Sequence, residues 1–392
     1  MKVEQLNTVA DVAALAPAWN RLSRGVPFRS WEWLGTWWEH YGGRATGSRG
    51  PATLFVLAVR HDDEIVGLAP WYLQPHPLYG RVVRFLGDGE VCSDYLSVLC
   101  KPGWEAKVAA TLAEWLLTES PTDAEGGWSL LEFDQIDAED LMMRRLIDEL
   151  AARGALEYCQ PGASCWRVSL PEAWDEYVAS LCKQHRRKVR AWQRNVFDSC
   201  RGQWHTATTP EELEVGWPIL VDLHQRRRRS LGEPGCFASP RFTAFHEAVT
   251  RKLMAAGKLR LQWLTLDGRP AAAGYFLSGN GVVYAYQSGV EVDALAEEPG
   301  HLTFMAALRS AIGAGFRSFD LLRGDEPYKA LWRARPRPAM NFRILQGRVA
   351  DRLVYSLWSA GDSVKAWLRG RLNKPATTPQ PATDAALQLA VR

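Results

Sequence analysis

Three consecutive strand patterns joined by two glycine-containing turns constrain the fold of this 392-residue chain more than any other feature. The patterns occupy residues 258–268, 269–279 and 281–290. Asp267-Gly268 and Asn280-Gly281 stand at the junctions, and such pairs favour tight hairpins because both positions tolerate a positive φ. The segment therefore predicts an antiparallel meander of three strands.

The second half of the chain surrounds this meander with helices. Apolar residues at helical spacing predict helices over 171–197, 209–229, 239–257 and 298–315, the second of which opens on the capping-type sequence Thr-Pro-Glu-Glu. Strand patterns occupy residues 200–207 and 316–324. Helices that alternate with a small sheet define a compact α/β unit.

The first half predicts a second α/β unit, one small sheet with helices on it, although no residue-level repeat relates the two halves. The expected helices are residues 9–22, 30–42, 103–119 and 138–154. In the second of them, Trp31, Trp37 and Trp38 are placed for burial. The expected strands are residues 53–74, a hairpin about Asp62-Asp63, followed by 81–89, 93–100, 129–136 and 165–170.

These patterns divide the chain into an N-terminal domain at residues 1–165, a C-terminal domain at 166–350 and a terminal segment at 351–392. An amphipathic helix is expected over 351–372, where the apolar residues at helical spacing are Leu353, Leu357, Val364 and Leu368. We expect this helix to dock onto the body. The alternative is peripheral association with a membrane surface, because Lys365, Arg369 and Arg371 flank it. The tail beyond it is expected to be disordered.

Composition narrows the class of protein. Apolar residues at 47% and charged residues at 23% are ordinary for a globular enzyme, and a net charge of +3 requires any anionic partner to meet a local patch. The start lacks a signal-like segment, and no run reaches about 18 apolar residues. The seven cysteines form no C-x-x-C pair. We therefore expect a cytoplasmic protein with reduced thiols and no metal site.

An aspartate lies inside the strand pattern at 316–324. Asp320 has apolar neighbours along the strand, and such a carboxylate is desolvated, which raises its pKa and makes it a general-base candidate. The alternative is a structural ion pair of Asp320 with Arg317, Arg323 or Lys329.

The loop that follows this strand concentrates ionisable groups between a glycine and a proline that favour a tight turn. Asp325 and Glu326 supply two carboxylates. Tyr328 can give a proton to a leaving thiolate, and Lys329 can bind a phosphate or a carboxylate. Residues 324–329 are therefore a candidate catalytic segment.

A basic stripe runs along the helix expected at 171–197. Its members recur at helical spacing and are Lys183, Arg186, Arg187, Arg190 and Arg194. The stripe is either a solvated helix face or a track for an anion such as a nucleotide, an RNA end or a charged glycan. The run from Arg226 to Arg229 either extends the track or is a polar helix end.

Pro299-Gly300 begins the helix that follows the meander. A helix start exposes backbone N–H groups, which bind phosphate readily. The adjacent His301 is either a base or a polar residue of the first turn.

Four segments together resemble the GNAT-type acyltransferases of the CelD/BcsL-like family, which is associated with cellulose and exopolysaccharide biosynthesis. They are residues 87–99, 185–195, 235–249 and 297–332. The resemblance is strongest over residues 170–345. It implies two tandem GNAT-like folds, as in FemABX-type peptidyltransferases, with the second fold active. Typical members of the wider superfamily transfer an acyl group from acyl-CoA to an amine without a metal.

The family's motifs map onto this sequence with one departure. Its Pro-Gly helix start falls on Pro299 and Gly300, and its Asp-x-x-x-Gly-Asp-x-x-Tyr-Lys pattern falls on Asp320, Gly324, Asp325, Tyr328 and Lys329. The pyrophosphate loop Q/R-x-x-G-x-G/A of ordinary GNAT enzymes is absent before the helix that begins at Pro299. Coenzyme A binding is therefore expected from fold analogy, and an aminoacyl-tRNA donor stays open as the alternative.

These inferences predict an N-acyltransferase that uses acetyl-CoA or a longer acyl-CoA to modify an amino group of a sugar or other cell-envelope precursor. Asp320 would deprotonate the acceptor, or Asp325 or Glu326 if Asp320 is ion-paired, and Tyr328 would protonate the thiolate. The thioester oxyanion would be held by backbone N–H groups of Tyr286, Gln287 and Ser288. The residues expected to hold the donor phosphates are Gly300, His301, Lys329, Arg186 and Arg190.

Two other functions stay open. A FemABX-like peptidyltransferase would use the basic stripe for the end of an aminoacyl-tRNA. A non-catalytic scaffold of polysaccharide biosynthesis would keep the fold without the chemistry.

Overall fold

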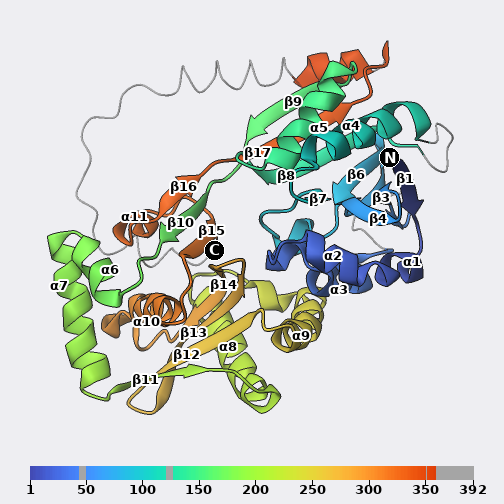
Figure 1. Cartoon of the computed structure of the whole chain (residues 1–392). Coiled ribbons are helices and arrows are strands. Elements are labelled where there is room, and N and C mark those ends of the chain that lie inside the picture. Colours follow the sequence, from blue (N-terminus) through green and yellow to red (C-terminus); the bar gives the residue numbers. More distant parts are fainter. Residues whose placement is uncertain (44–49, 121–126, 350, 359–392) are drawn as a thin grey trace. The chain divides into compact units, whose positions relative to one another are not determined.

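The computed structural model describes residues 1–43, 50–120, 127–349 and 351–358. The chain divides into two compact units (Figure 1). Unit 1 comprises Met1–Arg24, Phe28–Ala163 and the described residues from Pro338 onward, and unit 2 comprises Gly25–Pro27 and Ser164–Arg337. The first boundary falls close to residue 165, whereas the return of the chain to unit 1 at Pro338 has no counterpart in the domains expected from the sequence.

Unit 1 has two sheets among its described residues, so the expectation of one small sheet is wrong. Pro70 explains the division, because it offers no N–H to a ladder, and one strand ends just before it while another begins just after it. The four-stranded antiparallel sheet has the order β1 (Lys2–Leu6), β3 (Val56–His61), β4 (Glu64–Ala69), β7 (Leu99–Cys100). The six-stranded sheet has the order β2 (Thr53–Leu54), β5 (Trp71–His76), β6 (Gly80–Phe85), β8 (Leu130–Asp137), β17 (Ala339–Leu345), β9 (Leu156–Pro161). The hairpin about Asp62-Asp63 is confirmed as the turn between β3 and β4.

The helices of unit 1 agree with the sequence except at their ends and at one break. They are α1 (Val9–Ala14), α2 (Ala16–Leu22), α3 (Trp31–Tyr41), α4 (Glu105–Glu114) and α5 (Leu141–Ala152). The single helix expected over 9–22 is divided at Leu15, because Pro17 in the first turn of α2 cannot donate to the preceding turn. In α3, Trp37 is buried as expected, whereas Trp31 and Trp38 are half-buried.

The seven-stranded sheet of unit 2 contains the predicted meander. Its order is β11 (Gly202–Thr206), β12 (Leu259–Leu266), β13 (Arg269–Gly279), β14 (Val282–Val290), β15 (Ser318–Arg323), β10 (Cys165–Ser169), β16 (Arg335–Arg337). Asp267, Gly268, Asn280 and Gly281 all have positive φ, as the two turns require. β14 and β15 pair in parallel, and the other neighbours pair antiparallel. The strand expected at 165–170 therefore belongs to this sheet and not to the first half's sheet.

The helices of unit 2 are α6 (Trp174–Ser180), α7 (Lys183–Trp192), α8 (Pro210–Ser230), α9 (Pro240–Ala255), α10 (Pro299–Gly313) and α11 (Tyr328–Leu331). The single helix expected over 171–197 is wrong, because Leu181 and Cys182 are extended and separate α6 from α7. The break buries Leu181 in the core. A π-helical turn, η4 (Gln193–Asp198), continues α7. The capping box that opens α8 is confirmed, with Thr209 and Glu212 each bonding the other's backbone.

Helices cover both faces of the unit 2 sheet. Neighbouring residues of β13 show this, because Tyr275 meets Trp217 of α8 while Phe276 joins the core cluster that includes Leu308 of α10. Alternate side chains of a strand point to opposite faces. α8 and α10 therefore lie on opposite sides of the sheet, and both pack on β12, β13 and β14.

The helix expected at 351–372 is described as far as Trp358. Val354, Tyr355 and Trp358 pack on the unit 1 cluster around Leu345, so the described turns dock onto the body as predicted. The face is different from the predicted one, since Leu353 and Leu357 are 69% and 73% exposed. Val364, Leu368, the flanking basic residues and the tail lie outside the described residues. No helix in the described segments is long and apolar enough to span a bilayer.

Candidate functional site

β14 and β15 share a ladder over three residue pairs and then part. The pairing begins at Val282 with Ser318 and ends at Tyr284 with Asp320. Beyond this point β14 continues to Val290 along β13, and β15 continues along β10. The separation of two parallel strands in the middle of a sheet leaves backbone groups of both strands directed toward the space between them.

A β-bulge lies on β14 just after the strands part. Tyr275 pairs with Gln287 and Phe276 with Ala285, so Tyr286 is the extra residue. A bulge bends its strand and redirects the local backbone groups. The predicted oxyanion segment, Tyr286 to Ser288, is therefore located at the point where the sheet opens.

The side chain of Tyr286 is anchored on α9 by a histidine that sequence reasoning missed. His246 Nε2 lies 3.1 Å from Tyr286 Oη, and His246 Nδ1 lies 3.4 Å from Tyr275 Oη. His246 is fully buried, and this desolvation lowers its pKa well below its usual value, so the imidazole is neutral at pH 7. A histidine on the buried face of the helix at 239–257 was the available sequence signal.

Asp320 is fully buried and engaged on both carboxylate oxygens. Arg167 Nε of β10 lies 2.7 Å from Asp320 Oδ2, and the Leu322 backbone N–H donates to Oδ1 at 2.8 Å. The structural alternative expected an ion pair of Asp320 with Arg317, Arg323 or Lys329. An ion pair is observed with Arg167, which was not among these expected partners. The contact pattern is that of an ion pair that joins β10 to β15.

The loop after β15 is held together by Lys329. The Lys329 ammonium is buried, donates to the carbonyls of Leu322, Arg323 and Gly324 at 2.8 to 3.2 Å, and lies 2.9 Å from Glu326 Oε2. The Lys329 ammonium therefore points toward the end of β15. Its contacts hold the loop to the strand, in place of the phosphate contact expected from the sequence.

The remaining loop residues lie nearer to solvent. Asp325 is exposed and accepts a hydrogen bond from Trp166 Nε1 at 2.9 Å. Tyr328 is half-buried, and desolvation, with a smaller contribution from Glu326, raises its pKa well above the usual value of 10. The phenol therefore keeps its proton throughout the neutral range and can act as a proton donor.

The first turn of α10 is open beside Gly300. A Cβ added there would meet one atom within 4 Å, Val290 Cγ1 at 3.8 Å. The preceding Glu298 is bound by Lys188 Nζ at 2.8 Å and Trp192 Nε1 at 2.9 Å. Burial alone would raise the pKa of Glu298, but these bonds outweigh it and lower the pKa. The carboxylate is thus neutralised beside the helix start, which keeps that start compatible with an anion.

His301 is part of an aromatic cluster beneath this turn. It is buried and stacks on Trp192 with ring centroids 5.1 Å apart. Its surroundings correspond to the first-turn structural alternative considered for it. The contact with a donor phosphate that the sequence suggests for His301 stays a prediction.

The basic stripe is the solvent face of α7. Its opposite face is buried and consists of His185, Val189 and Trp192. Arg190 is exposed, whereas Arg186 is half-buried and donates to the Ala179 carbonyl at 2.7 Å. The run from Arg226 to Arg229 is partly ion-paired, since Arg226 contacts Asp222 and Glu291, and Arg228 contacts Glu233.

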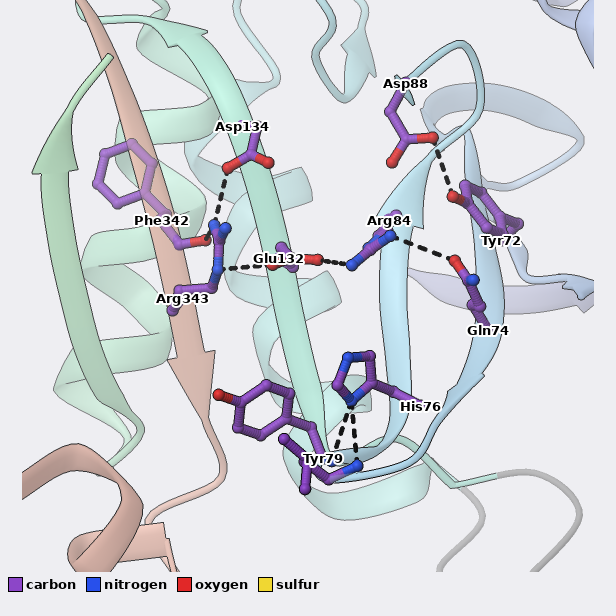
Figure 2. Close-up of polar contacts among 11 residues, drawn as sticks. Tyr72, Gln74, His76, Tyr79, Arg84, Asp88, Glu132, Asp134, Phe342 and Arg343 are labelled. Carbon is purple, nitrogen blue, oxygen red and sulfur yellow. Dashed lines mark hydrogen bonds and ion pairs between the residues drawn. The ribbon is translucent and has the colours of Figure 1, made fainter. Parts of the chain in front are cut away.

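Unit 1 carries a chain of polar contacts across its six-stranded sheet, and Figure 2 shows these side chains meeting on one face. Arg84 of β6 is ion-paired to Glu132 of β8, and Arg343 of β17 binds both Glu132, at 2.7 Å, and Asp134, at 2.8 Å. Tyr72 Oη donates to Asp88 Oδ1 at 2.9 Å.

Asp88 is the titratable end of this chain. Desolvation raises the pKa of Asp88 to about 7, against the opposing effect of Arg84. The loop that carries Asp88 is the first-half segment that resembles the CelD/BcsL-like family. Sequence reasoning had assigned no role to it.

The two units repeat one arrangement. β6 and β8 run parallel and pair at Val82 with Leu130 and at Val83 with Leu131, as β14 and β15 do over their first pairs. In the next position of β8, Glu132 stands opposite Arg343 of β17. Asp320 stands opposite Arg167 in the same relation on β15 and β10. In unit 1, Arg84 also bridges the parting strands to Glu132.

This arrangement of a meander, a helix and a parallel strand is the GNAT-like fold. Residues 183–330 match the model of the acetyltransferase (GNAT) domain family. The fold class predicted from the sequence, α/β with two GNAT-like units in tandem, is confirmed. Assignment to the CelD/BcsL-like family stays a prediction.

Solved structures share the fold over most of the chain. The crystal structure of FemX is similar over 91% of this chain and 100% of its own, at 13% identity and a TM-score of 0.59. A conserved protein of unknown function from Bacteroides thetaiotaomicron VPI-5482 covers 88% of this chain and 100% of its own, at 10% identity and a TM-score of 0.50. At these identities the similarity concerns the fold alone. No curated protein matches the chain.

Proposed function

We propose that this protein is an N-acyltransferase that moves an acyl group from acetyl-CoA or a longer acyl-CoA to an amino group of a sugar or other cell-envelope or exopolysaccharide precursor. The observation that carries the proposal is the parting of β14 and β15 with the bulge at Tyr286, inside the segment that matches the GNAT domain. Backbone donors fixed at such an opening suit the oxyanion that forms when an amine attacks a thioester. We assign this role to the backbone of Tyr286, Gln287 and Ser288.

The acid–base roles follow from burial and pairing. Because Asp320 is ion-paired to Arg167 and Glu326 is ion-paired to Lys329, we assign the general-base role to Asp325. Tyr328 is assigned as the acid that protonates the departing thiolate, since its phenol stays protonated at neutral pH. The open first turn of α10 at Gly300, together with Arg190 on the exposed face of α7, is assigned to the donor phosphates.

An aminoacyl-tRNA-dependent peptidyltransferase is the second candidate function. It is favoured by the exposed basic face of α7, which would meet the phosphates of a tRNA end, and by the resemblance to FemABX-type enzymes. A third reading, a non-catalytic scaffold of polysaccharide biosynthesis, requires neither donor. A membrane-surface contact through the exposed Leu353 and Leu357 is compatible with each of them.

The test is a thermal-shift series on the full-length protein with coenzyme A, acetyl-CoA, longer acyl-CoAs and a charged tRNA. A ligand at a hundredfold excess over its dissociation constant stabilises the folded state by about 2.7 kcal/mol. A shift with acyl-CoA, followed by release of free thiol when an amino sugar is added, is the expected result. A shift with charged tRNA alone would favour the peptidyltransferase, and no shift with any donor would favour the scaffold.

A further inference from the structure

Two residues outside the roles assigned so far form a close side-chain pair beside β14. Cys236 Sγ lies 3.3 Å from His224 Nε2, and His224 Nδ1 lies 2.9 Å from the Ser288 carbonyl oxygen. His224 is 2% exposed on the inner face of α8, whereas Cys236 is partly accessible. Neither the family resemblance nor the motif assignments give His224 or Cys236 a function.

The contacts of His224 decide which of its ring nitrogens carries the proton. A carbonyl oxygen only accepts hydrogen bonds, so Nδ1 must carry the hydrogen that meets Ser288. Nε2 then presents its lone pair to the Cys236 thiol. Desolvation lowers the pKa of His224 to about 4, so the ring is neutral at pH 7 and this lone pair is available.

The loop that carries Cys236 is fixed to the same helix as His224. Gln225 Nε2 donates to the Pro234 carbonyl at 3.0 Å, and Arg228 lies 2.7 Å from Glu233. Gly235 has φ +75°, and a Cβ there would lie 2.1 Å from Gln225 Oε1. Cys236 is therefore held at a set distance from the imidazole before any ligand arrives, which is the preorganisation that a nucleophile and its base require.

Helix α8 also lies directly on β14 at this point. A Cβ at Gly289 would come within 2.3 Å of the His224 backbone nitrogen. Ser288, which orients His224, belongs to the backbone segment that the proposed function assigns to the thioester oxyanion. The thiol–imidazole pair is thus tied by one hydrogen bond to the segment proposed to hold the reacting carbonyl.

We propose that Cys236 and His224 form a nucleophilic pair that takes the acyl group from the thioester donor before it passes to the acceptor amine. This inference rests on the acyltransferase function proposed above. A thiol beside a neutral imidazole whose other nitrogen is bound to a fixed acceptor is the arrangement that activates a cysteine for acyl transfer.

The bonds of the two steps balance without a further reactant. In the first step, His224 Nε2 takes the proton from Sγ, the Sγ–acyl carbon bond forms and the acyl carbon–sulfur bond of the donor breaks. The imidazolium, in place of Tyr328, then returns the proton to the coenzyme A thiolate. In the second step, the amine nitrogen bonds to the acyl carbon and the bond to Sγ breaks. The amine proton passes through His224, in place of the loop carboxylate, to Sγ. The products are the amide and free coenzyme A.

The first experiment is an acid-quenched reaction of the full-length protein with acetyl-CoA and no amine, read by intact mass and peptide mapping. We expect one acetyl group on Cys236, released by neutral hydroxylamine, in the wild type and in the control Cys182→Ser, which changes an exposed cysteine at the start of α7. Cys236→Ser should carry none. His224→Gln should form the acyl-enzyme on the order of a hundredfold more slowly. If His224→Gln does not fold, the comparison of Cys236→Ser with Cys182→Ser decides.

Two results would overturn the proposal and leave the acyltransferase function standing: an amine acetylated by wild-type protein that forms no acyl-cysteine, or wild-type turnover by Cys236→Ser. Alkylation by iodoacetamide tests the Cys236–His224 pair independently of acyl-CoA binding. If the protein binds no acyl-CoA, faster alkylation of Cys236 in the wild type than in His224→Gln still supports the nucleophilic pair and places the failure in the proposed function. Equal alkylation rates in the two proteins contradict the pair itself.

Discussion

Arg167 stands directly opposite Asp320 on neighbouring strands, and its Nε donates to the buried Asp320 carboxylate at 2.7 Å. The aspartate that the sequence offers as a general base is therefore occupied by a residue 153 positions away. The same relation between Arg343 and Glu132 in unit 1 shows that this ion pair is a feature of the fold, repeated where each parallel strand meets its antiparallel neighbour.

Replacing Asp320 by Asn should cost stability in addition to any loss of activity. Arg167 would lose its carboxylate at a partly buried site, and breaking a buried ion pair costs about 3 kcal/mol. Urea unfolding would measure the loss. Asp325→Asn, at an exposed position, is the matched control and should change stability by less than about 1 kcal/mol. An Asp320→Asn protein as stable as the wild type would contradict the structural role of this pair.

Replacing Lys329 by Met should lower stability, because three carbonyls of the strand end and Glu326 would lose a charged partner. Bonds to charged groups are worth about 1.5–3 kcal/mol each in net terms, and partial rehydration of an exposed loop reduces the sum, so we expect a loss of about 2–3 kcal/mol. Thermal unfolding and the KM for acyl-CoA should be measured together. A raised KM with unchanged stability would instead assign Lys329 to the donor phosphates, as the sequence motif implied.

Asp88 should make stability fall as the pH rises from about 4 to about 8. Its pKa is raised by burial from 3.8 to about 7, so between these values the unfolded chain has lost the proton that the folded chain retains. The contribution is present below pH 4 and is lost as the pH passes through 7. Asp88→Asn keeps the acceptor for Tyr72 and removes the titration. Between pH 5 and pH 8, the free energy of unfolding of the variant should therefore rise by about 1–3 kcal/mol relative to that of the wild type. An identical pH profile for the two proteins would show that Asp88 is not desolvated.

Alanine should destabilise the protein at one glycine near the proposed site, Gly289, and be tolerated at another, Gly300. A Cβ at Gly289 would lie 2.3 Å from backbone of α8, so Gly289→Ala should cost about 2 kcal/mol or more by forcing the helix off β14. Gly300→Ala meets one contact at 3.8 Å and should leave stability nearly unchanged. Denaturant unfolding compares the two. Equal stability for both variants would mean that α8 does not rest on β14 at Gly289.

The parts of the fold that the sequence predicts are those determined by neighbours in the chain. The meander follows from Asp267-Gly268 and Asn280-Gly281, and the start of α8 follows from Thr209 and Glu212, because these residues act on their own backbone. The break between α6 and α7 is not predictable in this way, because it depends on the burial of Leu181 in the core of unit 2.

In the candidate site, too, the features that the sequence predicts are those determined by neighbours in the chain. The open turn at Gly300 and the exposed Arg190 lie where the sequence pattern indicates. The partner of Asp320, the clamp made by Lys329 and the contact between His224 and Cys236 depend on residues brought together by the sheet. Local spacing does not indicate these contacts, since the ion-pair partners that it suggested for Asp320 all lay within nine residues of it.

The position of β17 means that the sheet of unit 1 can be completed only late in synthesis. β17 lies between β8 and β9 in the sheet of unit 1, yet it is made only after Ser164–Arg337 of unit 2 has been synthesised. Until Ala339–Leu345 arrives, the ladder edges of β8 and β9 have no strand between them, and open edges of this kind invite pairing with other chains. A chain that stops before Pro338 thus contains every strand of the unit 2 sheet but lacks one strand of unit 1, and the earlier-made unit would be the one that aggregates.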